Sequence, residues 1–160
     1  QHRSHGIDVE LLQFVPLADP VKICRLTLRN RTPRRRRLSI TAYVEWVLGA
    51  SRCVTAPYVI TEFAAADRAL LARNAWHGGG AERVAFLALG AGRVRWTGDR
   101  TEFLGRHGSL DQPAALATGV ELSNHTGGGL DPCGAVQTPI TLEPDGSAEV
   151  VVLLGQSATR

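Results

Sequence analysis

Hydrophobic and polar residues alternate regularly along residues 38–48. The apolar positions of this stretch are Leu38, Ile40, Ala42, Val44, Trp46 and Leu48. A period of two puts one face of a strand on a core and leaves the other face wet or against a second layer. A helix with the same sequence would scatter these residues around its circumference. The pattern therefore predicts a β-strand.

Shorter stretches of the same kind lie on both sides of this one. Strands are predicted at residues 7–15 and around 24–28, and the arginine-rich segment after residue 28 is expected to join the second of these to residues 38–48 as a hairpin loop. Residues 143–146 carry the Pro and Asp-Gly of a turn. The alanine-rich residues 64–73 allow a short helix. Further strands are predicted at residues 58–63, 83–89, 93–97, 140–142 and 148–154.

Many short strands separated by glycine and proline favour an all-β fold, namely an antiparallel β-sandwich. The chain holds 17 glycines and 8 prolines, and residues 127–135, with three consecutive glycines and Asp131-Pro132, predict a structural corner. Its 160 residues suit a single domain covering residues 1–160. Because the chain begins at Gln1 and contains no methionine, we expect it to be a fragment of a longer protein.

Composition excludes several classes of protein. Apolar residues make up 44% and charged residues 21%, as in ordinary globular domains, and no segment approaches the roughly 20 apolar residues of a transmembrane helix. Cys24, Cys53 and Cys133 are far apart, which favours a reducing compartment over a disulfide scaffold or thiolate zinc site. The five histidines lack metal-binding spacing, so no metal and no cofactor is expected.

Positive charge is concentrated in one part of the chain. Of 17 arginines, seven lie between residues 25 and 37, and four are consecutive: Arg34, Arg35, Arg36 and Arg37. Such a cluster can bind the phosphates of a nucleic acid, or it can be a solvated loop. No nucleic-acid-binding motif accompanies the arginines, and aromatic residues, which could stack on bases, are only 6%. We therefore expect no nucleic-acid partner and keep that function as an alternative.

Residues 96–108 combine aromatic, charged and glycine residues in a way that suits a sugar. Asp99 and Glu102 are not expected to form the carboxylate pair of a glycosidase, because residues three apart in an extended chain point to opposite faces. Instead we expect a loop that offers hydrogen-bonding groups to hydroxyl or phosphate oxygens beside an apolar ring. The substrate-binding candidates are Trp96, Asp99, Arg100, Glu102 and Arg106. The alternative is that an Asp–Arg pair simply holds this loop to its own domain.

Six blocks of sequence, in the same order as in the family, resemble the amino-terminal domain of glycoside hydrolase family 94. The resemblance is strongest to the phosphorylase-like region of NdvB-type cyclic β-1,2-glucan synthases. The blocks are DPVKI (19–23), YVEWVLG (43–49), LARN (71–74), TGDRTEFLGR (97–106), GLDPC (129–133) and LLGQ (153–156). The resemblance implies a supersandwich of the galactose-mutarotase-like kind, shortened at its amino-terminal side, that precedes an (α/α)6 barrel.

The resemblance also implies a division of labour. Members of the family break β-linked gluco-oligosaccharides with inorganic phosphate as co-substrate and invert the anomeric centre. Their general acid and phosphate-binding residues lie mainly in the barrel, so we expect no catalytic residue in this chain. The expected partners are a β-glucan oligosaccharide in the parent's cleft, the catalytic barrel and a second copy in a homodimer, with no direct membrane contact.

Three functions follow as expectations. The first is a non-catalytic domain of a glucan phosphorylase or cyclic β-1,2-glucan synthase that supports the barrel and contributes loops to its glucan cleft or dimer interface. The parent would be an inverting phosphorylase or glycosyltransferase on the cytoplasmic side, at the inner membrane if it is a membrane protein. The second is a free-standing carbohydrate-binding module. The third is nucleic-acid binding through Arg34, Arg35, Arg36 and Arg37.

Overall fold

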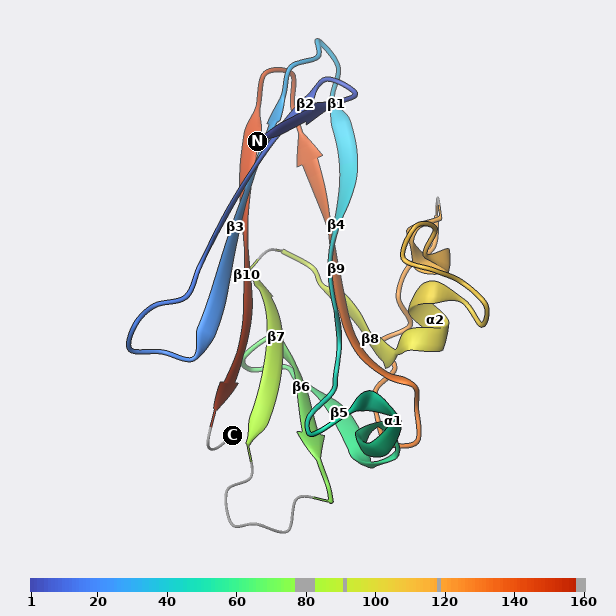
Figure 1. The fold of residues 1–160 in the computed structure, drawn as a ribbon. Coiled ribbons are helices and arrows are strands. Elements are labelled where there is room, and N and C mark those ends of the chain that lie inside the picture. The colour runs from blue at the N-terminus through green and yellow to red at the C-terminus, as the bar shows by residue number, and fades with distance from the viewer. Residues whose placement is uncertain (77–82, 91, 118, 158–160) are drawn as a thin grey trace.

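The computed structural model describes residues 1–76, 83–90, 92–117 and 119–157 and consists of two β-sheets packed face to face (Figure 1). All paired strands are antiparallel, so the predicted antiparallel β-sandwich is confirmed. The strands are β1 (His2–Ser4), β2 (Ile7–Phe14), β3 (Val21–Asn30), β4 (Arg36–Glu45), β5 (Val59–Ala64), β6 (Ala69–Asn74), β7 (Val84–Gly90), β8 (Arg95–Asp99), β9 (Pro132–Leu142) and β10 (Ser147–Ser157). Short helical segments are α1 (Arg52–Thr55), η1 (Ala56–Tyr58), α2 (Arg100–Leu104) and η2 (Ala114–Leu116).

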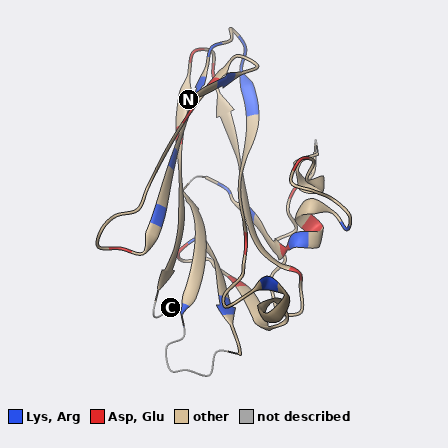
Figure 2. Ribbon diagram, viewed as in Figure 1, with Lys and Arg blue, Asp and Glu red and all other residues tan. Residues whose placement is uncertain are grey.

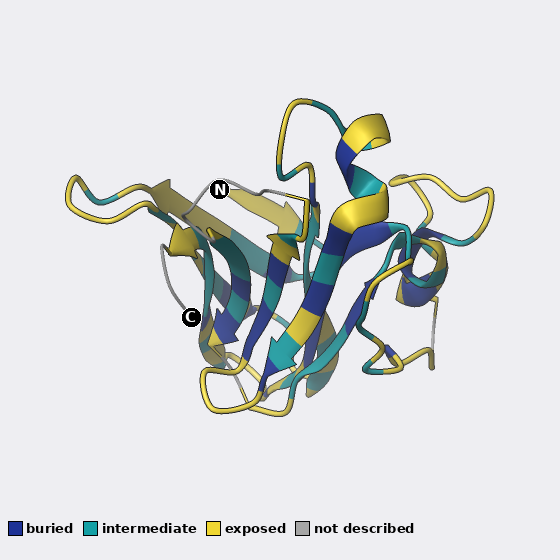
Figure 3. Cartoon of the chain, turned by 90° about the horizontal axis from the view of Figure 1, so that it is seen from below, coloured by how far each residue is buried: buried dark blue, intermediate teal, exposed yellow. Residues whose placement is uncertain are grey.

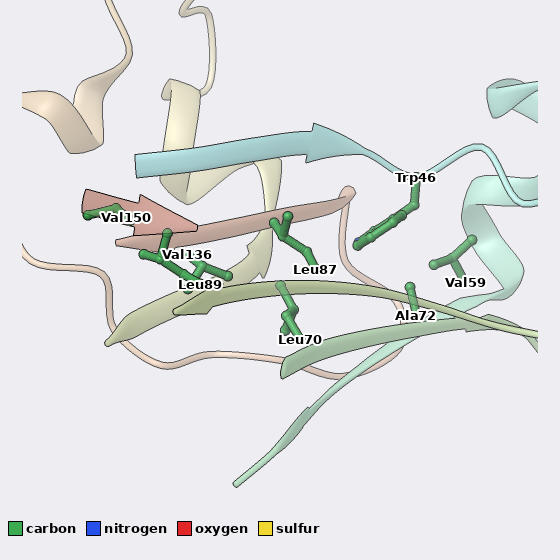
Figure 4. Packing of buried hydrophobic residues seen from close by; sticks show 8 residues of the cluster. All are labelled: Trp46, Val59, Leu70, Ala72, Leu87, Leu89, Val136 and Val150. Carbon is green, nitrogen blue, oxygen red and sulfur yellow. The ribbon is translucent and has the colours of Figure 1, made fainter. Parts of the chain in front are cut away.

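The two sheets differ in size. The larger has seven strands in the order β1-β2-β3-β10-β7-β6-β5, and the smaller has three in the order β4-β9-β8. The core lies between them, where alternate residues of the facing strands meet (Figure 4). Its buried members are Trp46, Val59, Leu70, Ala72, Leu87, Leu89, Val136 and Val150. Each large apolar side chain fully buried here contributes about 1.5–3 kcal/mol, which makes this cluster the main source of stability.

A second core lies on the opposite face of the small sheet. There α2 and η2 cover β4 and β9, and the ring of Phe103 stacks on that of Tyr43 with centroids 4.4 Å apart. Figure 3 shows burial concentrated where elements face one another, whereas the connecting loops are exposed. The hairpin between β2 and β3 is exposed as well. The small sheet is therefore covered on both faces, and this fixes the position of α2.

The prediction that the arginine-rich loop closes a hairpin is wrong. β3 pairs with β2 and β10 in the large sheet, whereas β4 pairs with β9 in the small sheet, so the loop between them crosses from one sheet to the other. The turn at residues 143–146 is confirmed by the bond from Gly146 N–H to Glu143 O, 2.9 Å. It also crosses between sheets, since β9 and β10 belong to different ones.

One buried side chain, Asn30, connects these two crossings. Its Nδ2 donates to the carbonyl oxygens of Arg34 (2.7 Å) and Glu143 (3.0 Å), and its Oδ1 accepts from the N–H and hydroxyl of Thr32. Its own N–H donates to Gly146 O at 2.9 Å. Because Asn30 is fully buried, these bonds replace water that the backbone groups would otherwise need. We call Asn30 and the two crossings the upper corner, after its position in Figure 1.

The alanine-rich segment at residues 64–73 is not a helix. It contains the end of β5, a turn and most of β6, and the two strands pair from Ala64↔Ala69 to Val59↔Asn74. Leu70 and Ala72 alternate into the core, so tertiary packing overrides the helix preference of alanine. Among the described residues, no helix has the length and hydrophobicity needed to cross a membrane.

Candidate functional site

The predicted substrate segment is a strand followed by a short helix rather than a long loop. Arg95–Asp99 forms β8, and Arg100–Leu104 forms α2. Asp99 is the N-cap of α2, and its Oδ1 accepts from Thr101 N–H at 2.8 Å. An acceptor at this position satisfies a backbone donor that the first turn leaves free. From the sequence we expected a loop here and did not use the Asp99-x-x-Glu102 spacing, which is a signal for a helix start.

Glu102 has a structural role inside the segment. Its carboxylate accepts from the hydroxyl of Thr97, and from the N–H (2.7 Å) and hydroxyl (2.9 Å) of Ser123. These contacts tie β8, α2 and the segment before β9 together. A sugar hydroxyl could reach this carboxylate only by competing with three internal donors, so Glu102 is a poor candidate for substrate contact.

Arg100 belongs to a network of four charged side chains. Its Nε donates to Glu45 at 2.8 Å and its Nη1 to Asp131 at 3.4 Å. Arg52, from α1, pairs with the same two carboxylates, at 3.6 Å from Glu45 and in direct contact with Asp131. Arg100 N–H also donates to Asp131 O at 2.7 Å. We call Glu45, Arg52, Arg100 and Asp131 the charge network.

The charge network is partly shielded from solvent, with 26–39% of each side chain exposed. The hydrogen bond from Arg100 is the main cause that lowers the pKa of Glu45 below its usual value. Tyr43 also donates to Glu45, at 2.9 Å, but burial of its hydroxyl raises the pKa of Tyr43 far above the ordinary value. Both effects favour a fixed arrangement of an ionised Glu45 carboxylate and a neutral Tyr43 phenol.

Trp96 does not offer a free face in the way the sequence predicts. Its ring lies parallel to that of Phe63, with centroids 3.5 Å apart, and both pack against the main core. Phe63 comes from β5 and Trp96 from β8, so the stack bridges the two sheets. The apolar ring that we expected to lie against a sugar is thus used in the core.

Arg106 is the predicted residue that remains available. It is exposed, it follows Gly105, whose φ of 90° turns the chain away from α2, and it has no ion pair or hydrogen bond to any described residue. The structure thus separates the five candidates. Asp99, Arg100 and Glu102 are held by internal contacts, Trp96 is in the core, and Arg106 has no partner in the part of the chain that the structure describes.

The arginine-rich segment lies at the upper end of the molecule, as Figure 2 shows by its blue ribbon. Several of its charges are compensated there. Arg35 pairs with Glu143 at 3.1 Å, Arg31 pairs with Asp8 at 2.7 Å, and Arg36 donates to His5 O at 2.9 Å. Arg34 and Arg37 are exposed, which leaves a small part of the predicted cluster for an anionic partner.

Sequence reasoning missed most of the charge network. Arg100 was selected, but its partners Glu45 and Asp131 lie 55 and 31 residues away, and Arg52 lies 79 residues from Asp131. No spacing rule connects residues on β4, α1 and the segment before β9. Within the described ranges, no three side chains of His, Cys, Asp or Glu come together in a way that could hold a metal ion.

Comparison with known proteins gives a family and two relatives. The family model described as "Glycosyl hydrolase 94, supersandwich domain" matches residues 1–160. Cyclic beta-(1,2)-glucan synthase NdvB of Rhizobium meliloti (strain 1021) is 36% identical over 151 residues, which cover 94% of this chain and 5% of that protein. Solabiose phosphorylase of Paenibacillus borealis is 32% identical over 144 residues, which cover 87% of this chain and 18% of that protein.

The chain therefore spans less than a fifth of the length of either relative. Its β-rich architecture agrees with the supersandwich description, and the family match covers the residues of all six sequence blocks. The chain belongs to glycosyl hydrolase family 94, of which it is a supersandwich domain.

Proposed function

We propose that this supersandwich domain is a non-catalytic part of a glucan phosphorylase or cyclic β-1,2-glucan synthase. In this proposal it supports a catalytic (α/α)6 barrel, and the segment around Arg106 contributes to the glucan cleft or to a dimer interface. Family membership supports the proposal, as do the names of the two relatives, one a glucan synthase and the other a phosphorylase. Inorganic phosphate would be the co-substrate, and the parent enzyme would act on the cytoplasmic side.

The main support for a non-catalytic role is that the acidic residues near α2 are engaged in internal contacts. A general acid must reach the atom that it protonates, and its proton must be free to move. Asp99 caps α2, Glu102 accepts from Thr97 and Ser123, and Glu45 is bound by Arg100. These contacts fit structural roles for all three carboxylates.

Arg106 supports a contribution to the cleft, because its side chain is exposed and no described residue forms an ion pair or hydrogen bond with its guanidinium. A guanidinium offers several donors in a fixed fork, which suits hydroxyl pairs as well as phosphate oxygens. Its position directly after α2 gives it a rigid base, since Phe103 and Leu104 are buried against the small sheet. A contact with the barrel's substrate would therefore be well oriented.

The test is Arg106→Ala in the full-length enzyme. We expect phosphorolysis to fall on the order of tenfold, as for the loss of one charged hydrogen bond, while the melting temperature stays within about one degree. Arg34→Ala is the matched control, because Arg34 is also an exposed arginine and lies in the upper corner, away from α2. A variant that melts several degrees lower with unchanged activity per folded molecule would show that the segment is structural.

A further inference from the structure

Two aromatic side chains lie together on the surface at the lower end of the sandwich, near α1. Trp76, just after β6, is 71% exposed, and Tyr58, in η1, is 38% exposed. Their ring centroids are 4.8 Å apart and their planes are tilted by 37°. An exposed tryptophan leaves a large apolar area in water, so its partner is expected to be a ligand or another surface.

The backbone beneath the rings is fixed by hydrogen bonds. Asn74 Oδ1 accepts from Trp76 N–H at 2.9 Å, and Asn74 Nδ2 donates to Leu48 O at 2.8 Å. Ala75 N–H donates to Tyr58 O, also at 2.9 Å. The turn that carries Trp76 is thus bound both to η1 and to the segment after β4. Such a platform loses little conformational entropy when a ligand binds.

A hollow of about 290 Å³ adjoins the same turn. Arg73, Asn74 and Ala75 line one part of it, and Arg83 and Gln156 line another. Arg83 Nη1 donates to Gln156 Oε1 at 3.5 Å, which leaves further guanidinium donors and the Gln156 amide N–H groups for a ligand. An apolar surface beside a few polar groups is the usual composition of a small-molecule site.

We propose that Tyr58 and Trp76 form a stacking platform for a pyranose ring, and that the adjoining hollow holds the next sugar of a neutral gluco-oligosaccharide. A β-linked glucose carries its C–H bonds on the two faces of the ring and its hydroxyls around the rim. The faces suit the negative face of an indole, and the hydroxyls suit arginine and amide groups. The choice of glucan as the ligand rests on the proposed function.

The structure also explains why Trp76, and not Trp96, takes this role. Trp96 stacks on Phe63, and Trp46 is 4% exposed in the core. Trp76 is therefore the tryptophan that a water-soluble quencher reaches most readily. Acrylamide quenching of the 160-residue chain reports directly on the proposed site, and calorimetric titration gives the affinity.

The probe is a linear β-1,2-linked glucotriose, with the α-1,4-linked trisaccharide as comparison. We expect saturable binding at millimolar concentration or tighter, with Trp76 protected from acrylamide. Trp76→Ala should weaken binding on the order of tenfold or more, as for the loss of an aromatic stacking surface. Phe14→Ala is the matched control and should leave binding unchanged, because Phe14 is 47% exposed on β2, which lies at the other side of the large sheet from β5 and β6.

Trp76→Phe keeps a ring against Tyr58, so it guards against a folding defect and should give an intermediate loss. The proposal is overturned if the glucotriose does not bind, if Trp76→Ala binds it as well as the original chain does, or if Phe14→Ala weakens binding equally. It is also overturned if two copies of the chain associate through these rings, so that Trp76→Ala abolishes the association instead of sugar binding. The Arg106→Ala experiment reads phosphorolysis, whereas this one reads binding with Arg106 unchanged, so either proposal can fail alone.

Discussion

The upper corner and the charge network both join segments that are far apart in the sequence, but they do so with different chemistry. At the upper corner the two crossings are connected by one neutral side chain, Asn30, which is fully buried and hydrogen-bonded to both of them. The arginines around it are exposed and their ion pairs lie on the surface. In the charge network, by contrast, ion pairs between the charged groups connect the distant segments, and these groups are only partly exposed.

This difference indicates which residues matter for stability. Exposed ion pairs contribute about 0–1 kcal/mol, because solvent screens the charges and ordering the side chains costs entropy. A buried polar group that loses its partner costs more, since the remaining groups cannot regain bonds to water. The number of arginines at the upper corner is therefore a poor guide to its strength. Three experiments test this comparison.

The largest effect is expected for Asn30→Ala. This change leaves the carbonyl oxygens of Arg34 and Glu143 and the donors of Thr32 without their buried partner. We expect the free energy of unfolding to fall by about 2–4 kcal/mol. Urea denaturation measures it, with Arg34→Ala as the control in the same loop. A loss below about 0.5 kcal/mol would mean that the two crossings are held by something other than Asn30.

Glu45→Gln should have a smaller effect that depends on pH. At neutral pH we expect a loss of about 1 kcal/mol, because the amide cannot accept as strongly from Arg100 and Arg52. The lowered pKa of Glu45 means that its stabilising effect is present above the usual carboxyl pKa and is lost as the pH falls through the lower, folded-state value. The difference in the free energy of unfolding between the original chain and Glu45→Gln should therefore become smaller as the pH falls.

Denaturation curves at several pH values between neutral and strongly acidic conditions measure this convergence. Glu149→Gln is the control, because Glu149 pairs with Arg25 at 3.7 Å and about half of each side chain is exposed. We expect that variant to change stability by less than about 0.5 kcal/mol. An equal loss in both variants would mean that the charge network is no stronger than an ordinary surface pair.

The smallest effect is expected for the double variant Arg34→Ala, Arg37→Ala. Both side chains are exposed, so stability should change by less than about 0.5 kcal/mol. Adding the original chain at low salt should not change the electrophoretic mobility of duplex or single-stranded nucleic acid. Binding that weakens steeply with salt and disappears in the double variant would restore the nucleic-acid function that we set aside.

The aromatic residues show how far a local pattern can lead. Trp96 lies in a block that suits a sugar site, yet its ring is used to bridge the two sheets. Trp76 follows the LARN block at the end of a strand and gave no signal, yet it is the most exposed tryptophan. A sequence pattern gives the type of side chain that a position carries. Whether a ring is covered depends on which strand crosses over it.

The amino-acid sequence by itself determined most of the strands, the sandwich class and the family. Alternation fixes which residues of a strand share a face, and this is a local property with a period of two. Ordered blocks of sequence carried the family resemblance. Only the tertiary structure decided that β3 and β4, neighbours in the chain, belong to different sheets, and that Arg100 pairs with Glu45 and Asp131. The physical reason is that burial and ion pairing depend on contacts between distant segments, whose entropy of closure is overcome only when the whole core forms.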